Sequence, residues 1–280
     1  MEKQLKVMVP VDFMPVSFKA LEFLGLLMDQ MPIETHLVHV IQVNATDWAG
    51  SSESSETLDR AEMRAMEQTA EEQFAQLRQQ VDFKFTQHVL HGGLTTSLAN
   101  YANLQQVDLV IMGTEGADGW YEKISGSEAQ HVVRYTDVPV ITIHQNVGIT
   151  PIHNILWVAD FAYEKQPQRS ISLIKVLQRI FGAKIHLLQI LQKEDAHQEL
   201  ALRENMMRFA NNLQLENYEL HFHRDFKVPT GVRNFNQESE KNLVVIGTHA
   251  RKGVNHLFYG SIAETLVNHC IRPLLTYHLK

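Results

Sequence analysis

The sequence predicts an α/β protein with two doubly wound domains, each built on a five-stranded parallel sheet in the strand order 3-2-1-4-5. Three observations lead to this prediction. Short apolar segments of strand type alternate with amphipathic segments of helix type along the 280 residues. Several strand segments are apolar at every position, as in a parallel sheet that helices cover on both faces. The order of the segments then restarts halfway along the chain, which indicates an internal duplication.

The first half, residues 1–146, supplies a complete set of alternating strands and helices. Its strand segments are LKVMVPVDF (5–13), THLVHVIQV (35–43), DFKFTQHVL (82–90), VDLVIMG (107–113) and VPVITIH (138–144). Helical spacing of apolar residues predicts helices over 17–30, 57–80, 95–106 and 127–136. The polar, serine-rich stretch 44–56 is typical of a loop.

The second half, residues 152–280, repeats this order. The segments HNILWVADF (153–161), KIHLLQILQ (184–192), KNLVVIGTH (241–249) and RPLLTYH (272–278) match strands one, two, four and five, and 170–183 matches the first helix. Residues 243–278 align without a gap on 109–144 at an offset of 134, with about a third of the pairs identical. Asp160 and His186 lie 148 and 150 positions after Asp12 and His36, so the second half is sixteen residues shorter. We expect the serine-rich loop and part of the long helix to be the excess, and the domain boundary to lie within 146–151.

Composition excludes several classes of protein. The net charge is −7 and the pI is about 6.1, so there is no basic surplus to neutralise nucleic acid or an anionic membrane. A single cysteine, Cys270, excludes an internal disulfide. The chain shows no signal-peptide pattern and no apolar run of the roughly 18 residues that a spanning helix needs. These features predict a cytoplasmic protein.

Two glycine-rich stretches carry the main functional signal. GTEGADGWYEKISGS (113–127) places Gly113, Gly116, Gly126 and Ser127 at set intervals, and GTHARKGVNHLFYGS (247–261) repeats Gly247, Gly260 and Ser261 with Ala250 in place of the second glycine. Each stretch begins at the end of an apolar strand and finishes at the start of a helix. Free N–H groups at the helix start, close backbone approach at glycine and a serine hydroxyl all suit a phosphate. Glycines that only cap and turn the chain are the alternative reading. Neither GxxxxGK[ST] nor GxGxxG occurs.

These stretches, together with VPVDF and LVHV in the first half and VADF and LLQI in the second, resemble the universal stress protein family, as a tandem pair covering almost the whole chain. The resemblance implies adenine-nucleotide binding, with ATP, with or without Mg, as the cofactor. It implies that the backbone of Val40 or Ile190 reads the adenine edge, and that Asp12 or Asp160 lines the adenosine. Ribose and phosphates would be held by Gly113, Gly116, Gly126 and Ser127, or by Gly247, His249, Gly260 and Ser261. It also implies that the halves pair around a pseudo-twofold axis through their last strands.

The two clefts differ in charge. Near the first loop, Glu115, Asp118, Glu122 and Glu128 oppose only Lys123, whereas His249, Arg251, Lys252 and His256 near the second face no acid. Because carboxylates repel a triphosphate and cations attract it, the second half is expected to bind ATP more tightly, although the methyl group of Ala250 counts against it.

Three functions fit these features. The first is a nucleotide-binding regulator of the stress response that acts on an unknown protein partner. The second is a nucleotide-free interaction scaffold of the same fold, and the third is a slow ATPase. No catalytic residue is assigned, because no nucleophile or second acid stands near Asp12 in the sequence. An intramolecular pseudo-dimer is expected, with a homodimer as a further possibility.

Histidine pairs raise the question of a metal. His221 and His223 share one face of a strand, but an exposed edge strand explains that pattern equally well, and no carboxylate is recognised at ligand spacing. His36 and His39 fall on opposite faces of their strand. The sequence therefore assigns no metal site.

Overall fold

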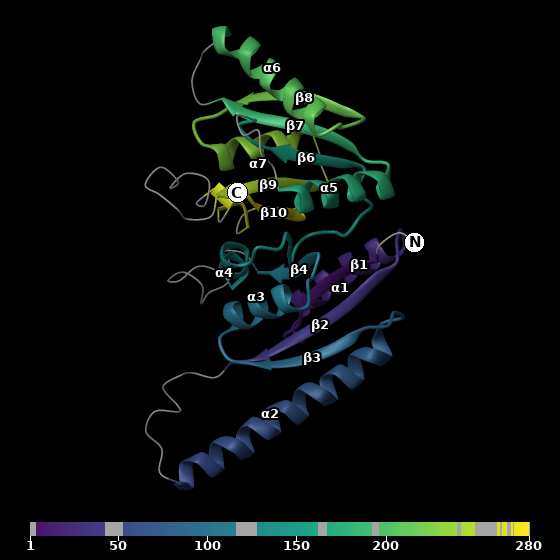
Figure 1. Ribbon diagram of the computed structural model, residues 1–280, viewed down its shortest axis with the longest axis vertical. Coiled ribbons are helices and arrows are strands. Elements are labelled where there is room, and N and C mark those ends of the chain that lie inside the picture. The colour runs from purple at the N-terminus through teal and green to yellow at the C-terminus, as the bar shows by residue number, and fades with distance from the viewer. Residues whose placement is uncertain are drawn as a thin grey trace.

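The computed structural model describes the chain except for residues 1–3, 43–52, 116–127, 162–166, 192–195, 240–241, 250–261, 264, 268–269, 271 and 280. The described residues form a single ten-stranded sheet in the order β3-β2-β1-β4-β5-β10-β9-β6-β7-β8. Each half therefore contributes the predicted order 3-2-1-4-5, and the halves are stacked along the long axis of the molecule (Figure 1).

The elements alternate as the sequence predicts. The first half contains β1 (Leu5–Pro10), α1 (Pro15–Met28), β2 (Ile33–Ile41), α2 (Glu53–Gln80), β3 (Thr86–His91), α3 (Leu94–Leu104), β4 (Leu109–Thr114), α4 (Glu128–Tyr135) and β5 (Val140–His144). The second half contains β6 (Asn154–Val158), α5 (Gln168–Phe181), β7 (Lys184–Leu191), α6 (Ala196–Asn212), β8 (Tyr218–Arg224), α7 (Val228–Ser239), β9 (Leu243–His249) and β10 (Leu274–Leu279).

The last strands of the two halves form the junction between them. β5 and β10 pair antiparallel, with Ile141 opposite Leu275, whereas the other strand pairs within each half are parallel. The predicted pairing through VITIH and LLTYH is thus confirmed, and the tandem domains form an intramolecular pseudo-dimer. One continuous sheet results, rather than two sheets with separate edges at the centre.

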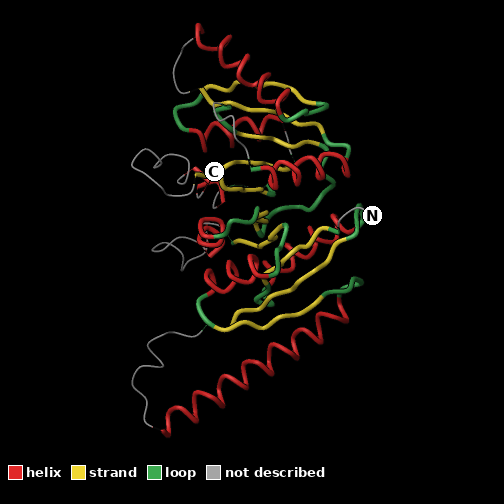
Figure 2. The backbone as a smooth tube through the Cα atoms, in the orientation of Figure 1, coloured by secondary structure: helices red, strands yellow, loops and turns green. Residues whose placement is uncertain are grey.

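Helices cover both faces of this sheet (Figures 1 and 2), and each face carries its own core. On one face α1, α2, α5 and α6 pack on alternate strand residues such as Val7, Ile111, Trp157 and Tyr277. On the other face α3, α4, α7 and the described part of 262–267 pack on the intervening residues, such as Met8, Met112 and Val158. Strand side chains alternate between faces, so the uniformly apolar strand segments feed both cores.

Two local features depart from or extend the predictions. β3 begins at Thr86 rather than Asp82, and the preceding Phe85 ring lies under the guanidinium of Arg78 at 4.3 Å. The long helix α2 has 28 residues against 17 in α6, which accounts for part of the length difference between the halves.

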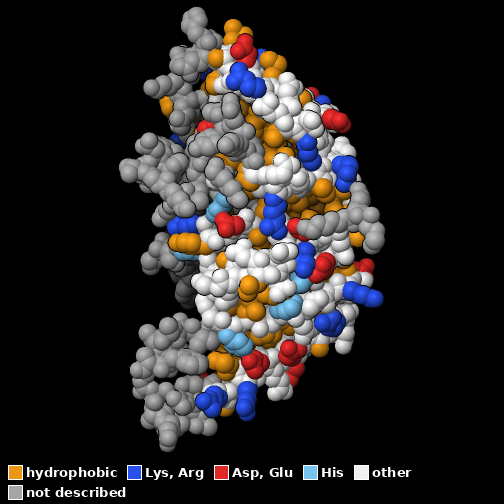
Figure 3. Space-filling model, in the orientation of Figure 1, with side chains coloured by type: hydrophobic (Ala, Val, Ile, Leu, Met, Phe, Trp, Pro, Cys, Tyr) orange, Lys and Arg blue, Asp and Glu red, His pale blue; other side chains and the backbone are white. Residues whose placement is uncertain are grey.

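Surface composition agrees with the charge balance of the sequence. On the face drawn in Figure 3, Lys and Arg side chains are scattered among Asp and Glu side chains rather than gathered into one patch. Within the described part of the chain, no helix combines the length and apolarity needed to cross a membrane.

Candidate functional site

A pocket of about 90 Å³ lies at the carboxyl ends of β1, β2 and β4 in the first half. This is the edge at which open parallel sheets bind ligands. Its lining brings together three residues that the sequence assigned to nucleotide binding, Asp12, Val40 and Gly113. The other lining residues are Pro10, Val11, Val16, Ser17, Val38, His39, Gln42, Leu94, Met112 and Glu128.

Asp12 shapes the turn between β1 and α1. Its Oδ1 accepts a hydrogen bond from the Met14 N–H at 2.9 Å, and the Ser17 hydroxyl donates to the Met14 carbonyl at 2.9 Å. The first bond satisfies the N–H of Met14, the residue before α1, and the second adds to the bond that the Met14 carbonyl accepts from the Ser17 N–H at 3.0 Å. The Asp12 carboxylate therefore stands at the pocket wall as part of a built turn.

In each half, the residue after the aspartate that follows the first strand adopts an unusual backbone conformation. Phe13 has φ of 61° and its counterpart Phe161 has φ of 55°. Side chains disfavour this left-handed region, so packing must hold it in place. The Phe13 ring lies 5.0 Å from both His39 and Phe74, and the Phe161 ring lies 5.1 Å from Phe209. The same strained turn therefore follows the first strand of both halves.

His39 fixes the same corner from β2. Its Nδ1–H donates to the Val11 carbonyl at 2.8 Å, which ties the end of β2 to the turn that carries Asp12. Sequence reasoning did not assign His39 to the cleft. The signal that could have found it is its position next to Val40 at the end of a strand.

Gly113 has a packing reason to be glycine. A Cβ atom at this position would lie 2.2 Å from the carbonyl oxygen of Val16, so β4 and the start of α1 meet at backbone distance. A Cβ at Gly247, its counterpart in the second half, would meet the Leu279 side chain at 2.9 Å. The first glycine of each frame therefore allows close contact between elements, a packing role beside the two that the sequence suggested, phosphate approach and chain turning.

An acidic side chain lines the first pocket. Glu128 begins α4, and its Oε1 accepts a hydrogen bond from the Gln42 amide at 3.1 Å. Its negative charge occupies the end of the helix that would otherwise attract an anion. In the second half this position is Ile262, which is buried.

The remaining predicted residues fall into two groups. Asp160 follows β6, Ile190 lies near the end of β7, and Gly247 and His249 lie in β9, so all four sit at the corresponding strand ends of the second half. The Ile190 side chain would contact a Cβ at Gly231 in α7 at 3.0 Å. The predicted residues Gly116, Gly126, Ser127, Gly260 and Ser261 lie outside the described residues.

A larger pocket of about 240 Å³ lies elsewhere, between α7 and the segment around Leu266. Arg233, Arg272 and the half-buried Cys270 are among its lining residues. None of the residues predicted for the nucleotide cleft lines it.

The sequence pattern of the universal stress protein family matches residues 5–144 and 158–278. The chain belongs to the universal stress protein family. The two matched segments correspond to two universal stress protein domains in tandem, as the duplication indicated. Members of this family often bind adenine nucleotides.

Individual relatives agree with this membership. A universal stress protein of Methanocaldococcus jannaschii is 22% identical over 138 residues, which is 49% of this chain and 81% of that protein. The solved structure of a universal stress protein from Archaeoglobus fulgidus is similar with a TM-score of 0.69 at 18% identity, covering 98% of both chains. A putative universal stress protein from Pseudomonas aeruginosa is similar with a TM-score of 0.62 at 16% identity, covering 98% of this chain and 92% of that one. These structures support the fold of the whole tandem universal stress protein.

Proposed function

We propose that this universal stress protein is a regulator of the stress response that binds an adenine nucleotide, ATP, at the carboxyl edge of its sheet. The observation that carries the proposal is the first-half pocket, where Asp12, from the turn after β1, meets Val40 of β2 and Gly113 of β4. These are the positions that the family resemblance assigns to the nucleotide, and they are far apart in sequence.

The residues present fit such a ligand. The backbone of Val40 at the end of β2 would read the adenine edge, and the Asp12 carboxylate would line the adenosine. Backbone N–H groups of the glycine frame and of the following helix start would hold the phosphates, as anions favour helix N-termini. Bound ATP would supply a charged group whose presence or absence changes the surface offered to a protein partner.

The two halves would bind with different strength. In the first half Glu128 lines the pocket at the start of α4, so a phosphate there would face a carboxylate. At close range and an effective dielectric near 20, such a repulsion amounts to a few kcal/mol before screening by salt. The second half has Ile262 instead, together with Arg251 and Lys252 in the loop sequence. We therefore propose that the second half holds the tighter site.

Titration calorimetry with ATP tests both statements. The unmodified protein should show one tighter site, which Gly260→Val removes and Gly126→Val leaves in place. Glu128→Ile, which gives the first half the residue of the second, should raise first-half affinity at least tenfold because it removes the repulsion. Glu22→Gln is the matched control, since it removes one carboxylate from an exposed ion pair with Lys19 on α1.

Two results would count against the proposal. A tighter site that disappears with Gly126→Val would move it to the first half. The absence of ATP binding in every variant would overturn nucleotide binding and leave an interaction scaffold as the function of the fold.

A further inference from the structure

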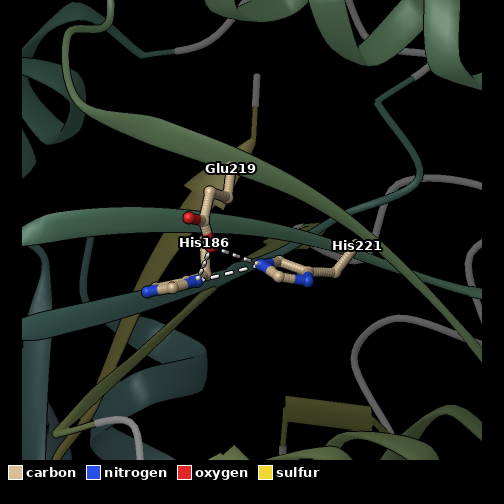
Figure 4. Close-up of side chains that lie close together, drawn as sticks. All are labelled: His186, Glu219 and His221. Atoms are coloured by element: carbon tan, nitrogen blue, oxygen red, sulfur yellow. Dashed lines mark hydrogen bonds and ion pairs between the residues drawn. The ribbon is translucent and has the colours of Figure 1, made fainter.

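A second cluster of polar side chains lies at the amino end of the second half's strands, away from the cleft. His186 comes from the start of β7, and Glu219 and His221 come from the adjoining edge strand β8. Figure 4 shows the two imidazole rings pointing toward each other, with the Glu219 carboxylate beside them. The cleft residue Ile190 is four positions further along β7, about 13 Å away along the strand.

The three ligand-type atoms form a small triangle. His186 Nδ1 and His221 Nε2 are 2.9 Å apart, and Glu219 Oε2 lies 3.5 Å from each of them. Tetrahedral zinc with bonds of about 2.0–2.1 Å separates its ligand atoms by about 3.3 Å. We propose that His186, Glu219 and His221 bind a divalent transition-metal ion of the zinc type. Each side of the triangle differs from the tetrahedral spacing by a few tenths of an ångström, so small side-chain shifts would admit the ion.

Neighbouring side chains orient His186 Nδ1 and Glu219 Oε2 toward the triangle. His186 Nε2–H donates to Asn154 Oδ1 at 2.9 Å, which leaves the lone pair on Nδ1 facing the triangle. The Lys184 ammonium holds Glu219 Oε1 at 2.7 Å, so Oε2 is the oxygen directed at the histidines.

Exposure allows an ion to reach the triangle from solvent. The His186 side chain is 5% exposed, whereas His221 is 26% and Glu219 is 46% exposed. Two histidines and one glutamate provide three protein ligands, and water would complete a tetrahedron. The proposed site therefore leaves one coordination position to water, which can exchange with solvent.

The first half shows the same histidine pair without the triangle. His36 and His88 hold the matching places on β2 and β3, with their rings stacked at 5.4 Å. There the Tyr101 hydroxyl meets His36 Nδ1 at 2.5 Å, and Glu34 Oε1 meets Nε2 at 2.8 Å.

Two substitutions between the halves explain the difference. Phe235 replaces Tyr101 on the covering helix, and Glu219 replaces Thr86 on the edge strand. The second half thereby lacks the hydroxyl that occupies Nδ1 in the first half and gains a carboxylate beside the pair. Sequence reasoning compared His221 with His223 and found no carboxylate at ligand spacing. In the structure Glu219 stands two residues before His221 on the same strand face, and the second histidine of the cluster comes from β7.

The test uses the full chain without a histidine tag, freed of metal by chelation, and Zn²⁺ alone as the probe. Calorimetry should show one site per chain that Glu219→Gln and His221→Gln each weaken at least tenfold. Phe235→Tyr should also weaken binding, because its hydroxyl would compete for His186 Nδ1 as Tyr101 does in the first half. Co²⁺ in place of Zn²⁺ should give the visible absorption of a tetrahedral site.

Matched controls come from the same strand and from the other half. His223→Gln, next on the same face of β8, and His88→Gln, in the equivalent place of the first half, should leave Zn²⁺ affinity unchanged. Circular dichroism of each metal-free variant separates loss of ligand from loss of fold. The proposal is overturned if the unmodified chain does not bind Zn²⁺, or if the affinity survives His221→Gln in a folded protein.

Discussion

At the scale of single residues, one phenolic hydroxyl, that of Tyr101, accounts for the different hydrogen bonds of the matching histidines in the two halves. Tyr101 satisfies the buried His36, whereas Phe235 leaves the matching His186 to meet His221 and Glu219. Tyr101 lies on α3 and is itself buried against the sheet, and burial, with a smaller effect from Glu34, raises its pKa to about 12. The folded state therefore favours the neutral, protonated form of Tyr101.

This pKa predicts how stability responds to alkali. Below the unfolded value near 10, Tyr101 is protonated in both states, and its contribution is fully present. As pH rises from 10 to about 12 the unfolded chain releases the proton first, so the free energy of unfolding falls. Tyr101→Phe should make that fall shallower, as measured by urea unfolding at a series of pH values. Tyr135→Phe, at a side chain that is 60% exposed, is the control, and equal slopes for Tyr101→Phe and the unmodified protein would contradict the prediction.

At the scale of elements, the contact between α1 and β4 sets the shape of the first cleft. Gly113 lets the strand backbone touch the first turn of the helix at Val16, and the Asp12 turn leads the chain into that helix. Gly25, inside the same helix, has open space where a Cβ would stand. Replacement by alanine is therefore expected to have opposite effects on the stability of the protein at Gly113 and at Gly25.

Gly113→Ala should destabilise the protein by about 1–3 kcal/mol, because the new methyl group would overlap the Val16 carbonyl. Gly25→Ala should stabilise it by about 0.5–1 kcal/mol, because alanine costs less conformational entropy in a helix. Both values can be read from chemical denaturation. If Gly113→Ala were as stable as the unmodified protein, the close approach of β4 and α1 would not be a constraint on this position.

At the scale of the whole molecule, the β5–β10 junction turns two domains into one sheet. Thr142 and Thr276 lie symmetrically about the Ile141–Leu275 pair, and each hydroxyl donates across the junction, to Leu274 and Val140. Side chains from the first-half and second-half strands belong to the same continuous core on each face. Tethering in one chain gives the halves a high effective concentration for this pairing.

Separated halves should therefore recombine. Residues 1–146 and 152–280, expressed apart, each present an unpaired edge strand with buried apolar residues, and a free edge of this kind favours association. Sedimentation of the mixture should show a one-to-one complex. Halves that remain stable monomers after mixing would show that the junction contributes little to holding the molecule together.

The sequence by itself determined the α/β class and the duplication, because these depend on local periodicity and on repeats within the chain. The predicted strand order was confirmed only by the pairing of the strands. The resemblance to the universal stress protein family indicated Asp12 and Val40, and the spacing of the glycines indicated Gly113. Only the tertiary structure decided that Gly113 serves a helix contact, that Glu128 lines the first pocket, and that His186 faces Glu219 and His221. Each of these depends on strands or helices distant in sequence meeting at a particular register and distance, which no local pattern encodes.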